Sequence, residues 1–263
     1  MLSNYLLTAW RHAQKNAVYI LINMLGLAFG IASCTVSFFN WQFHEEFDGQ
    51  HLNSETIYKV NSIKKDQGEL HKYATTPAAL ASSIPDQGFD IEAARYWAHQ
   101  SILRIGEKVL KRPSAFTDPS FTSIFTFHLI EGSFDLSNNG IILTKQFKEE
   151  LFGPETAIGQ SLELILDGQV VELQLNGIIE DHKLNSSFQF EVLMSYNLYR
   201  SIYGDANNSW ITDTHATFIS SNLSVSDLEF NLNKFVENVN VADPKAQLES
   251  FYVTPLKEIA NEA

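Results

Sequence analysis

The distribution of hydrophobic and polar residues divides the chain into two unequal parts. Residues 17–43 form a run of 27 positions without one formal charge, whereas charged and apolar residues are interspersed from residue 44 onward. A helix of that length extends roughly 40 Å, and the hydrocarbon core of a bilayer is about 30 Å thick. The pattern predicts a membrane-spanning helix at 17–43, between a short segment, 1–16, and a globular domain, 44–263.

Other uses of such an apolar segment fit less well. A secretory signal has an apolar region of roughly 7 to 15 residues, and a core helix normally carries a polar face. Trp10, Tyr19 and Trp41 lie near the predicted ends of the span, where interfacial aromatic residues are enriched. The residues before Cys34 resemble a bacterial lipoprotein cleavage site, but a lipidated start is normally followed by a polar tether. Here the chain stays apolar through Trp41, so we favour a span.

Small and polar residues form a stripe along the predicted helix. Their spacings of three and four residues confine them to about 100° of its surface. Glycine is common in membrane helices, so the stripe is consistent with chance. It also predicts packing against other membrane helices, because small residues allow close approach and Asn can hydrogen-bond across the contact. The stripe consists of Asn23, Gly26, Gly30, Ser33, Ser37 and Asn40.

From residue 44 onward the periodicity is that of an α+β domain. Residues 56–63 read as a strand, and Thr76-Pro77 predicts a helix start with a capping hydroxyl and Pro at the first helical position. Residues 89–98 favour a strand, although their Glu-Ala-Ala centre also suits a helix. The same order recurs near the other end. Strands are predicted at 215–220 and 248–255, around a helix that begins at Ser224 and carries the apolar face Leu228, Leu232, Phe235, Val236 and Val239.

The middle of the domain is richer in strands. Ile105-Gly106-Glu107-Lys108 and Asp167-Gly168 each separate two apolar arms and predict hairpins. A short helix is expected from Thr144 to a C-cap at Gly153. We therefore predict a split ferredoxin-like, porter-like layer, 44–99 and 213–263, with an inserted strand-rich lobe, 100–212.

Charge predicts the orientation of the span. Residues 1–16 contain Arg11 and Lys15 and no acid, whereas all 31 acids and 16 of the 18 Lys and Arg lie from Glu45 onward, a net charge of −15. Positive residues beside a first span favour the cytoplasmic side, so the large domain is expected outside. Trp10, Arg11, Lys15 and Trp41 are then the expected residues at the membrane interface.

The acidic outer domain limits its partners. It argues against nucleic acid, and also against electrostatic docking on anionic lipid. The single cysteine, Cys34, lies in the predicted span, so the outer domain has no disulfide and depends on its hydrophobic core.

Candidate chemistry in the outer domain is sparse. Carboxylates and two imidazoles cluster just beyond the span and could bind a metal, although such clusters are more often solvated faces. Glu180-Asp181-His182 follows a predicted strand end, but no nucleophile motif accompanies it. No G-x-S-x-G, P-loop, C-x-x-C or dinucleotide fingerprint occurs. We expect no catalytic, cofactor or metal residue. The cluster beyond the span consists of His44, Glu45, Glu46, Asp48 and His51.

An ordered set of short motifs resembles one family, the MacB-like and FtsX-like ABC transporter permeases. Gln50 and Lys148 depart from its usual pattern, which affects expectations of local packing only. The motifs are Ala9-Trp10-Arg11, Lys15-Asn16, Ile22-Asn23 and Leu25 to Gly30 in the span, His51 to Val60 after it, then Ile142-Leu143-Thr144, Leu151-Phe152-Gly153, Ile158 to Leu162, Gly177 to Asp181, and Asn185-Ser186 with Phe188 and Phe190.

The resemblance implies a periplasmic domain between the first span and later spans of a bacterial inner-membrane permease. It implies a separate cytoplasmic ATPase subunit, other permease spans or a second copy as partners, and a periplasmic adaptor or cargo. Such permeases export substrates or transmit motion to periplasmic proteins. The chain is then expected to be the N-terminal portion of a longer permease. The alternative is a self-contained, membrane-tethered binding or sensor domain.

Overall fold

The computed structural model describes residues 2–85, 90–137, 139–204, 210–211 and 213–261. Two compact units divide the chain, Met1–Glu46 and Phe47–Ala263. Phe89, the first residue of one predicted strand, lies outside the described residues.

The first unit consists of two helices, α1 (Leu2–Lys15) and α2 (Ala17–Glu45), which meet at Asn16. None of the residues of α2 is buried, and its most apolar window has a mean hydropathy of 2.0. Among the described residues, α2 is the one helix long and apolar enough to cross a membrane. This agrees with the predicted span, and the helix continues slightly beyond its predicted end.

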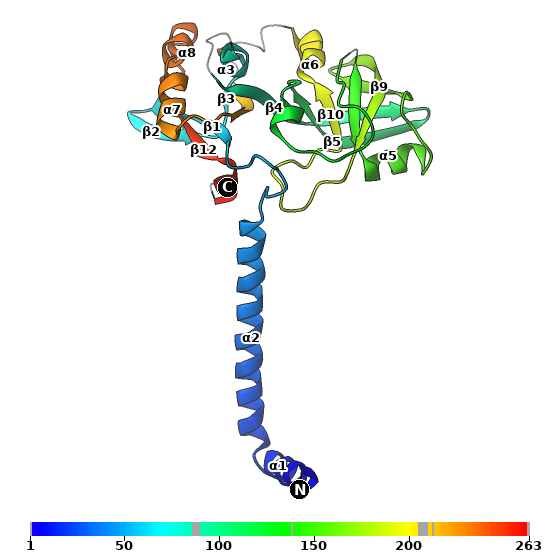
Figure 1. Ribbon diagram of the computed structural model, residues 1–263, viewed down its shortest axis with the longest axis vertical. Helices are drawn as coiled ribbons and strands as arrows, with labels where there is room; N and C mark the ends of the chain where they lie inside the picture. The colour runs from blue at the N-terminus through cyan, green and yellow to red at the C-terminus, as the bar shows by residue number, and fades with distance from the viewer. Residues whose placement is uncertain (1, 86–89, 138, 205–209, 212, 262–263) are drawn as a thin grey trace. The chain divides into compact units, whose positions relative to one another are not determined.

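The second unit contains an antiparallel layer in which strands from both ends of the domain pair with one another. Its strand order is β12-β1-β11-β4, and β2 extends from β1 (Figure 1). The first and last strands of the domain are therefore neighbours. The bounds are β1 (Ile57–Asp66), β2 (Glu69–Tyr73), β4 (Glu92–Ile105), β11 (Asp213–Ser220) and β12 (Leu248–Pro255).

Three short helices, α3 (Ala78–Ser83), α7 (Val225–Asn233) and α8 (Val236–Ala242), cover one face of this layer (Figure 1). Their apolar side chains pack against those of the strands, and Leu80 and Leu228 are fully buried there. Ser224 caps α7, because its hydroxyl accepts a hydrogen bond from the Asp227 amide at 3.2 Å, as predicted.

Two details of these predicted helices are wrong. Thr76 does not cap α3: it pairs with β11 in the short strand β3 (Thr76–Pro77), and its hydroxyl lies 2.7 Å from that of Thr217. The single helix expected after Ser224 is two helices, which are interrupted at Lys234–Phe235. Thr76 pairs with His215 of β11, which lies 139 residues further along the chain. A local motif could not reveal this pairing.

Six of the described strands form a closed ring. Successive pairings run β4-β5-β10-β7-β9-β8 and back to β4. The pairs β5–β10 and β7–β9 are parallel, whereas the others are antiparallel. The bounds are β5 (Lys108–Thr117), β7 (Gly140–Thr144), β8 (Ser161–Leu166), β9 (Gln169–Ile179) and β10 (Val192–Ser195), with β6 (Leu129–Gly132) outside the ring on β9.

Strand β4 belongs to both the layer and the ring. Residues 92–96 pair with β11, and residues 96–105 pair with β5. This double pairing explains why residues 92–98 are a strand despite their helix-compatible centre. It also makes one continuous sheet, so the two lobes are not separated by a linker.

The ring and the remaining helices enclose two further cores. Inward-facing aliphatic residues such as Leu164 and Leu173 fill the ring, and α5 and α6 close it with Phe147 and Tyr196. An aromatic core that includes Phe188 lies on the layer face opposite the helices. The remaining elements are α4 (Phe121–Ile124), α5 (Lys145–Phe152), α6 (Tyr196–Tyr203) and η3 (Leu256–Asn261).

The predicted turns of the ring are confirmed. Asp167 and Gly168 have φ angles of 49° and 77°, which a two-residue type I′ hairpin requires. Gly153 caps α5 with φ 77°. Lys148, which departs from the family pattern, is buried beside this cap and donates to the carbonyls of Gly153 and Glu155.

Candidate functional site

The stripe predicted for helix packing lies on α2. All six of its residues are exposed in the chain by itself. A Cβ added at Gly26 or Gly30 would meet nothing within 4 Å, so no described part of this chain occupies that surface. The predicted interface residues lie on both helices. Trp10 and Arg11 are in α1, Lys15 ends it, and Trp41 is near the end of α2.

At the start of the second unit, a loop pair that we call the clamp joins residues 48–52 to residues 183–189. The Asp48 carboxylate accepts hydrogen bonds from the Ser187 amide at 2.8 Å and the Ser187 hydroxyl at 2.5 Å. The Asp48 amide donates to the Asn185 carbonyl at 2.9 Å. Gln50, the other departure from the family pattern, donates to the Ser186 hydroxyl at 2.9 Å. Asp48 has φ 53°, a conformation that Asp tolerates better than most residues.

His51 belongs to the clamp and is 2 % exposed. Its Nδ1 accepts a hydrogen bond from the Thr126 amide at 3.1 Å, so the neutral ring carries its proton on Nε2. Three phenylalanines surround the ring, with the centroid of Phe125 at 5.0 Å. Burial lowers the pKa of His51, although the nearby Asp48 carboxylate opposes that shift. These contacts make His51 a neutral part of the core.

The metal hypothesis for the residues beyond the span therefore gains no support. Asp48 and His51 each have a structural hydrogen-bonding role, and His44, Glu45 and Glu46 belong to the first unit. Within the described ranges, no three His, Cys, Asp or Glu residues are grouped so that they could hold a metal ion.

The Glu180-Asp181-His182 motif is also structural. The Asp181 carboxylate accepts from the Gln146 amide at 2.9 Å and so caps the start of α5. The His182 ring packs on Phe190 at 4.3 Å. Burial is the main cause that lowers the pKa of His182, while Asp181 opposes the shift. A hollow of about 360 Å³ adjoins the motif, and Thr126, His128 and Lys183 are among the residues that line it.

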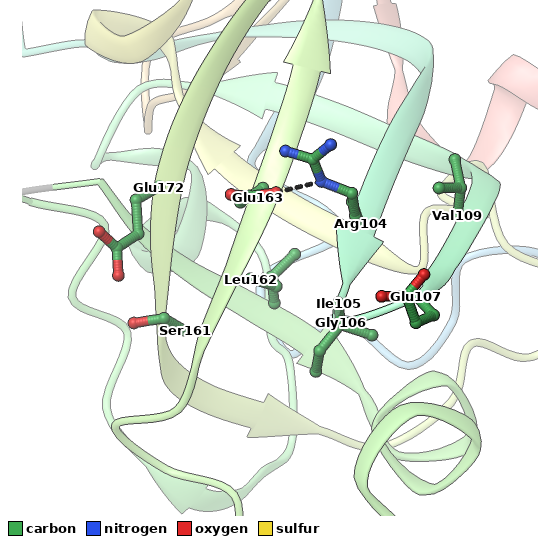
Figure 2. A pocket seen from close by; sticks show the side chains of 9 residues that line it. All are labelled: Arg104, Ile105, Gly106, Glu107, Val109, Ser161, Leu162, Glu163 and Glu172. Carbon is green, nitrogen blue, oxygen red and sulfur yellow. Dashed lines mark hydrogen bonds and ion pairs between the residues drawn. The ribbon is translucent and has the colours of Figure 1, made fainter.

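A wider hollow of about 720 Å³ lies beside the β4–β5 turn and strands β8 and β9 (Figure 2). Figure 2 shows the Arg104 guanidinium directed at Glu163, with which it forms an ion pair. The hydrogen bond from Arg104 lowers the pKa of Glu163. The Glu163 carboxylate therefore stays ionised and cannot act as a general acid near neutral pH. With Glu107 and Glu172, the hollow is an exposed, mostly acidic surface.

Sequence reasoning missed a largely buried, multiply hydrogen-bonded pair, Arg95 and Asp118. Arg95 of β4 donates from Nε and from its amide to Asp118 Oδ2, both at 2.8 Å, and from Nη2 to Oδ1 at 2.5 Å. Its guanidinium also stacks 3.8 Å above the Tyr196 ring centre. The pair lies where β4 passes from the layer into the ring. No local motif predicts it, because the partners are separated by a whole hairpin.

We expect the stability of the domain to fall as the pH is lowered from 7.5 to 5. Burial lowers the pKa of His51, His182 and His215, in the last case to about 4. Because each unfolded imidazole titrates near 6.5, the stabilisation is complete above that pH and is lost as the pH falls toward the folded values. Each group contributes a slope of up to about 1.4 kcal/mol per pH unit.

Urea unfolding of the detergent-solubilised chain at several pH values measures this effect. The groups that face these rings are Asp48 and Thr126 at His51, Asp181 and His51 at His182, and Arg95 and Asp118 at His215. His215→Phe should reduce the slope, because the ring lies among Tyr196, Tyr199 and Trp97. A midpoint that does not change across this range contradicts the expectation.

Comparison with solved structures identifies relatives of this fold. One is a domain described as part of a permease from Porphyromonas gingivalis, with a TM-score of 0.64, 18% identity, and coverage of 78% of this chain and 91% of that chain. Another is the periplasmic region of MacB from Actinobacillus actinomycetemcomitans, with a TM-score of 0.56, 13% identity, and coverage of 84% and 97%. A third is the extracellular domain of the noncanonic ABC-type transporter YknZ from Gram-positive bacteria, with a TM-score of 0.54, 12% identity, and coverage of 75% and 99%.

Sequence comparison gives the family. No curated protein sequence matches the chain significantly. A family model described as the MacB-like periplasmic core domain matches residues 20–233, which include most of α2 and most of the second unit. The ordered motifs and this match agree, and the chain belongs to the family of MacB-like periplasmic core domains.

Proposed function

We propose that this chain supplies the first membrane span and the periplasmic core domain of a MacB/FtsX-type ABC transporter permease. The observation that carries the proposal is the continuity of the family match, which begins within α2 and runs into the core domain. In this arrangement the N-terminus is cytoplasmic and the core domain lies in the periplasm of a bacterial inner membrane. ATP hydrolysis belongs to a separate cytoplasmic subunit, and the core domain itself is not an enzyme.

We infer that the antiparallel layer is the split ferredoxin-like, porter-like layer, formed by 44–99 and 213–263. Its two halves are β1–α3–β4 and β11–α7–α8–β12, and the order β12-β1-β11-β4 fits that topology. The ring, 100–212, is then the inserted lobe. Because β4 runs through both, a displacement of the layer carries the ring with it. This continuity supports a role in transmitting ATPase-driven motion to an adaptor or cargo outside the membrane.

Purification from the native membrane in mild detergent tests the proposal. A tagged chain should co-purify with a P-loop ATPase and with ATP hydrolysis, in an assembly that contains further permease spans or a second copy. A matched preparation that lacks the tag provides the control. Recovery of the chain alone, without ATP hydrolysis, favours a self-contained tethered binding domain instead.

The stripe on α2 predicts how this span packs. Gly26→Leu or Gly30→Leu should weaken helix association several-fold, because a leucine side chain blocks the close approach that small residues allow. Cysteine cross-linking along α2 in native membranes measures the association. Ile22→Leu, at an exposed position outside the stripe, is the control. Cross-linking that is unaffected by either glycine substitution argues against packing at the stripe.

A further inference from the structure

The clamp inverts the usual distribution of polar and apolar residues. Leu184 is 89 % exposed and Leu52 is 86 % exposed, which are the highest values among the large apolar side chains of the described residues. Even the large apolar side chains of α2 have smaller exposed fractions. Next to Leu52 in the sequence, His51 is only 2 % exposed. The loop buries an imidazole at a desolvation cost and presents a leucine outward, so burial of this leucine against an apolar surface would be favourable.

Hydrogen bonds hold both leucines on the clamp. The Leu52 amide donates to the Thr126 hydroxyl at 3.1 Å, and the His51 amide donates to the Asp48 carbonyl. Leu184 precedes Asn185, whose carbonyl accepts from the Asp48 amide. The Gln189 side chain donates to the Lys183 carbonyl at 2.8 Å. The outward position of both leucines is therefore fixed by the loops that carry them.

Covalent connection brings the clamp close to the end of α2. Helix α2 ends at Glu45, and Asp48 follows three residues later. An extended chain spans at most about 3.5 Å per residue, so Asp48 lies within about 10 Å of the helix end in any orientation of the two units. Trp41, an expected interface residue, lies four residues before the end of α2, so that end is about 6 Å beyond the interface. The loops bonded to Asp48 are therefore close to the membrane surface too.

We propose that Leu52 and Leu184 insert into the interfacial region of the bilayer that α2 crosses and thereby orient the core domain on it. The inference rests on the membrane span included in the proposed function. Leucine contributes through apolar burial, so this contact requires no anionic lipid and is compatible with an acidic domain. Exposed Lys183 beside Leu184 suits the same region, because its stem can lie along the membrane surface with the ammonium in water.

Depth-dependent fluorescence quenching of the full chain in phosphatidylcholine nanodiscs tests this contact. In a Cys34→Ser background, Leu52→Cys and Leu184→Cys each receive a small environment-sensitive fluorophore. The control is Val241→Cys on α8, which is 73 % exposed and lies on the helix-covered face of the layer, opposite the aromatic core beneath the clamp. We expect bromines near the headgroups to quench labels at 52 and 184 at least roughly twofold more than the control label.

The native Cys34, labelled in the unaltered chain, separates this inference from the proposed span. Bromines deep in the acyl chains should quench that label if α2 crosses the bilayer. Absence of quenching there refutes the span and with it the proposed function. Quenching at Cys34 with only control-level quenching at 52 and 184 overturns the leucine contact alone. Protection from an aqueous quencher without quenching by bromines also overturns it, because the leucines are then covered by protein.

Discussion

Asp118→Ala is expected to lower the free energy of unfolding of the core domain by about 3–5 kcal/mol. The substitution leaves the Arg95 guanidinium without its counter-ion, and Arg95 is only 5 % exposed. Three hydrogen bonds to the carboxylate are lost together. The Ala78 carbonyl, 3.3 Å from Nη1, and the Tyr196 ring cannot replace a full negative charge.

The Arg95–Asp118 pair lies between the layer and the ring, so its loss should also weaken the connection between them. Arg95 contacts the first residue of α3 through the Ala78 carbonyl, the residue after β5 through Asp118, and α6 through Tyr196. The Thr117 hydroxyl also donates to the Arg95 carbonyl at 2.6 Å. Besides the shared strand β4, the Arg95 guanidinium therefore connects elements of the layer with elements of the ring. Loosening it should weaken their connection before either lobe loses its own hydrophobic core.

Urea unfolding of the detergent-solubilised chain, followed by circular dichroism, measures the expected loss. Glu163→Ala, which removes the exposed ion pair with Arg104, is the control and should change the midpoint far less because solvent screens both partners. The double substitution Arg95→Met with Asp118→Leu should recover much of the loss, because it removes the unpaired charge. If the double variant is as unstable as Asp118→Ala, the buried charge is not the cause.

The elements that sequence reasoning predicted well are those specified by nearby residues. The uncharged run of α2 needs only length and composition. The Asp167-Gly168 hairpin needs two residues that tolerate positive φ, and Ser224 with Asp227 forms its cap within one turn. In each case the interacting groups lie within a few residues of one another. A local pattern is then sufficient.

The closed ring could not be predicted in the same way. It depends on two parallel pairings, β5–β10 and β7–β9, between strands that no short turn connects. Which strands become neighbours is decided by packing of the whole lobe. Thr76 illustrates the same limit, since its sequence suits a helix cap but its backbone pairs with β11.

Among the candidate functional residues, too, those set by nearby residues could be predicted and those set by distant contacts could not. The stripe on α2 follows from helical spacing, and its packing stays a prediction until other helices are placed beside it. The clamp was invisible in the sequence, because Asp48 and Ser187 are 139 residues apart. The residues beyond the span looked like a candidate metal cluster, whereas the structure uses two of them to join distant loops. The pairing of an exposed leucine with a buried histidine gave no signal in the sequence, because it can be recognised only once burial is known.

Gly177→Ala is expected to destabilise the core domain by about 3 kcal/mol, at the upper end of the cost of overpacking. Gly177 lies in β9, opposite Gly132 of β6 and Ile142 of β7. A Cβ at this position would lie 2.3 Å from the Ser133 carbonyl oxygen, which is backbone and cannot rotate away. The ladder is irregular on both sides here, and the Ser133 backbone leaves no room for a Cβ at Gly177.

The matched control is Gly106→Ala in the β4–β5 turn. A Cβ there meets nothing within 4 Å, and φ is +55°, so the change costs only the left-handed strain of about 1 kcal/mol. Hydrogen exchange in the two variants should also differ in place, with faster exchange along β6 and β9 for Gly177→Ala. Gly177 opens the motif that continues through Asp181, so displacement of β9 also disturbs the cap of α5. Equal unfolding midpoints for the two variants would show that the ring yields to the added methyl group.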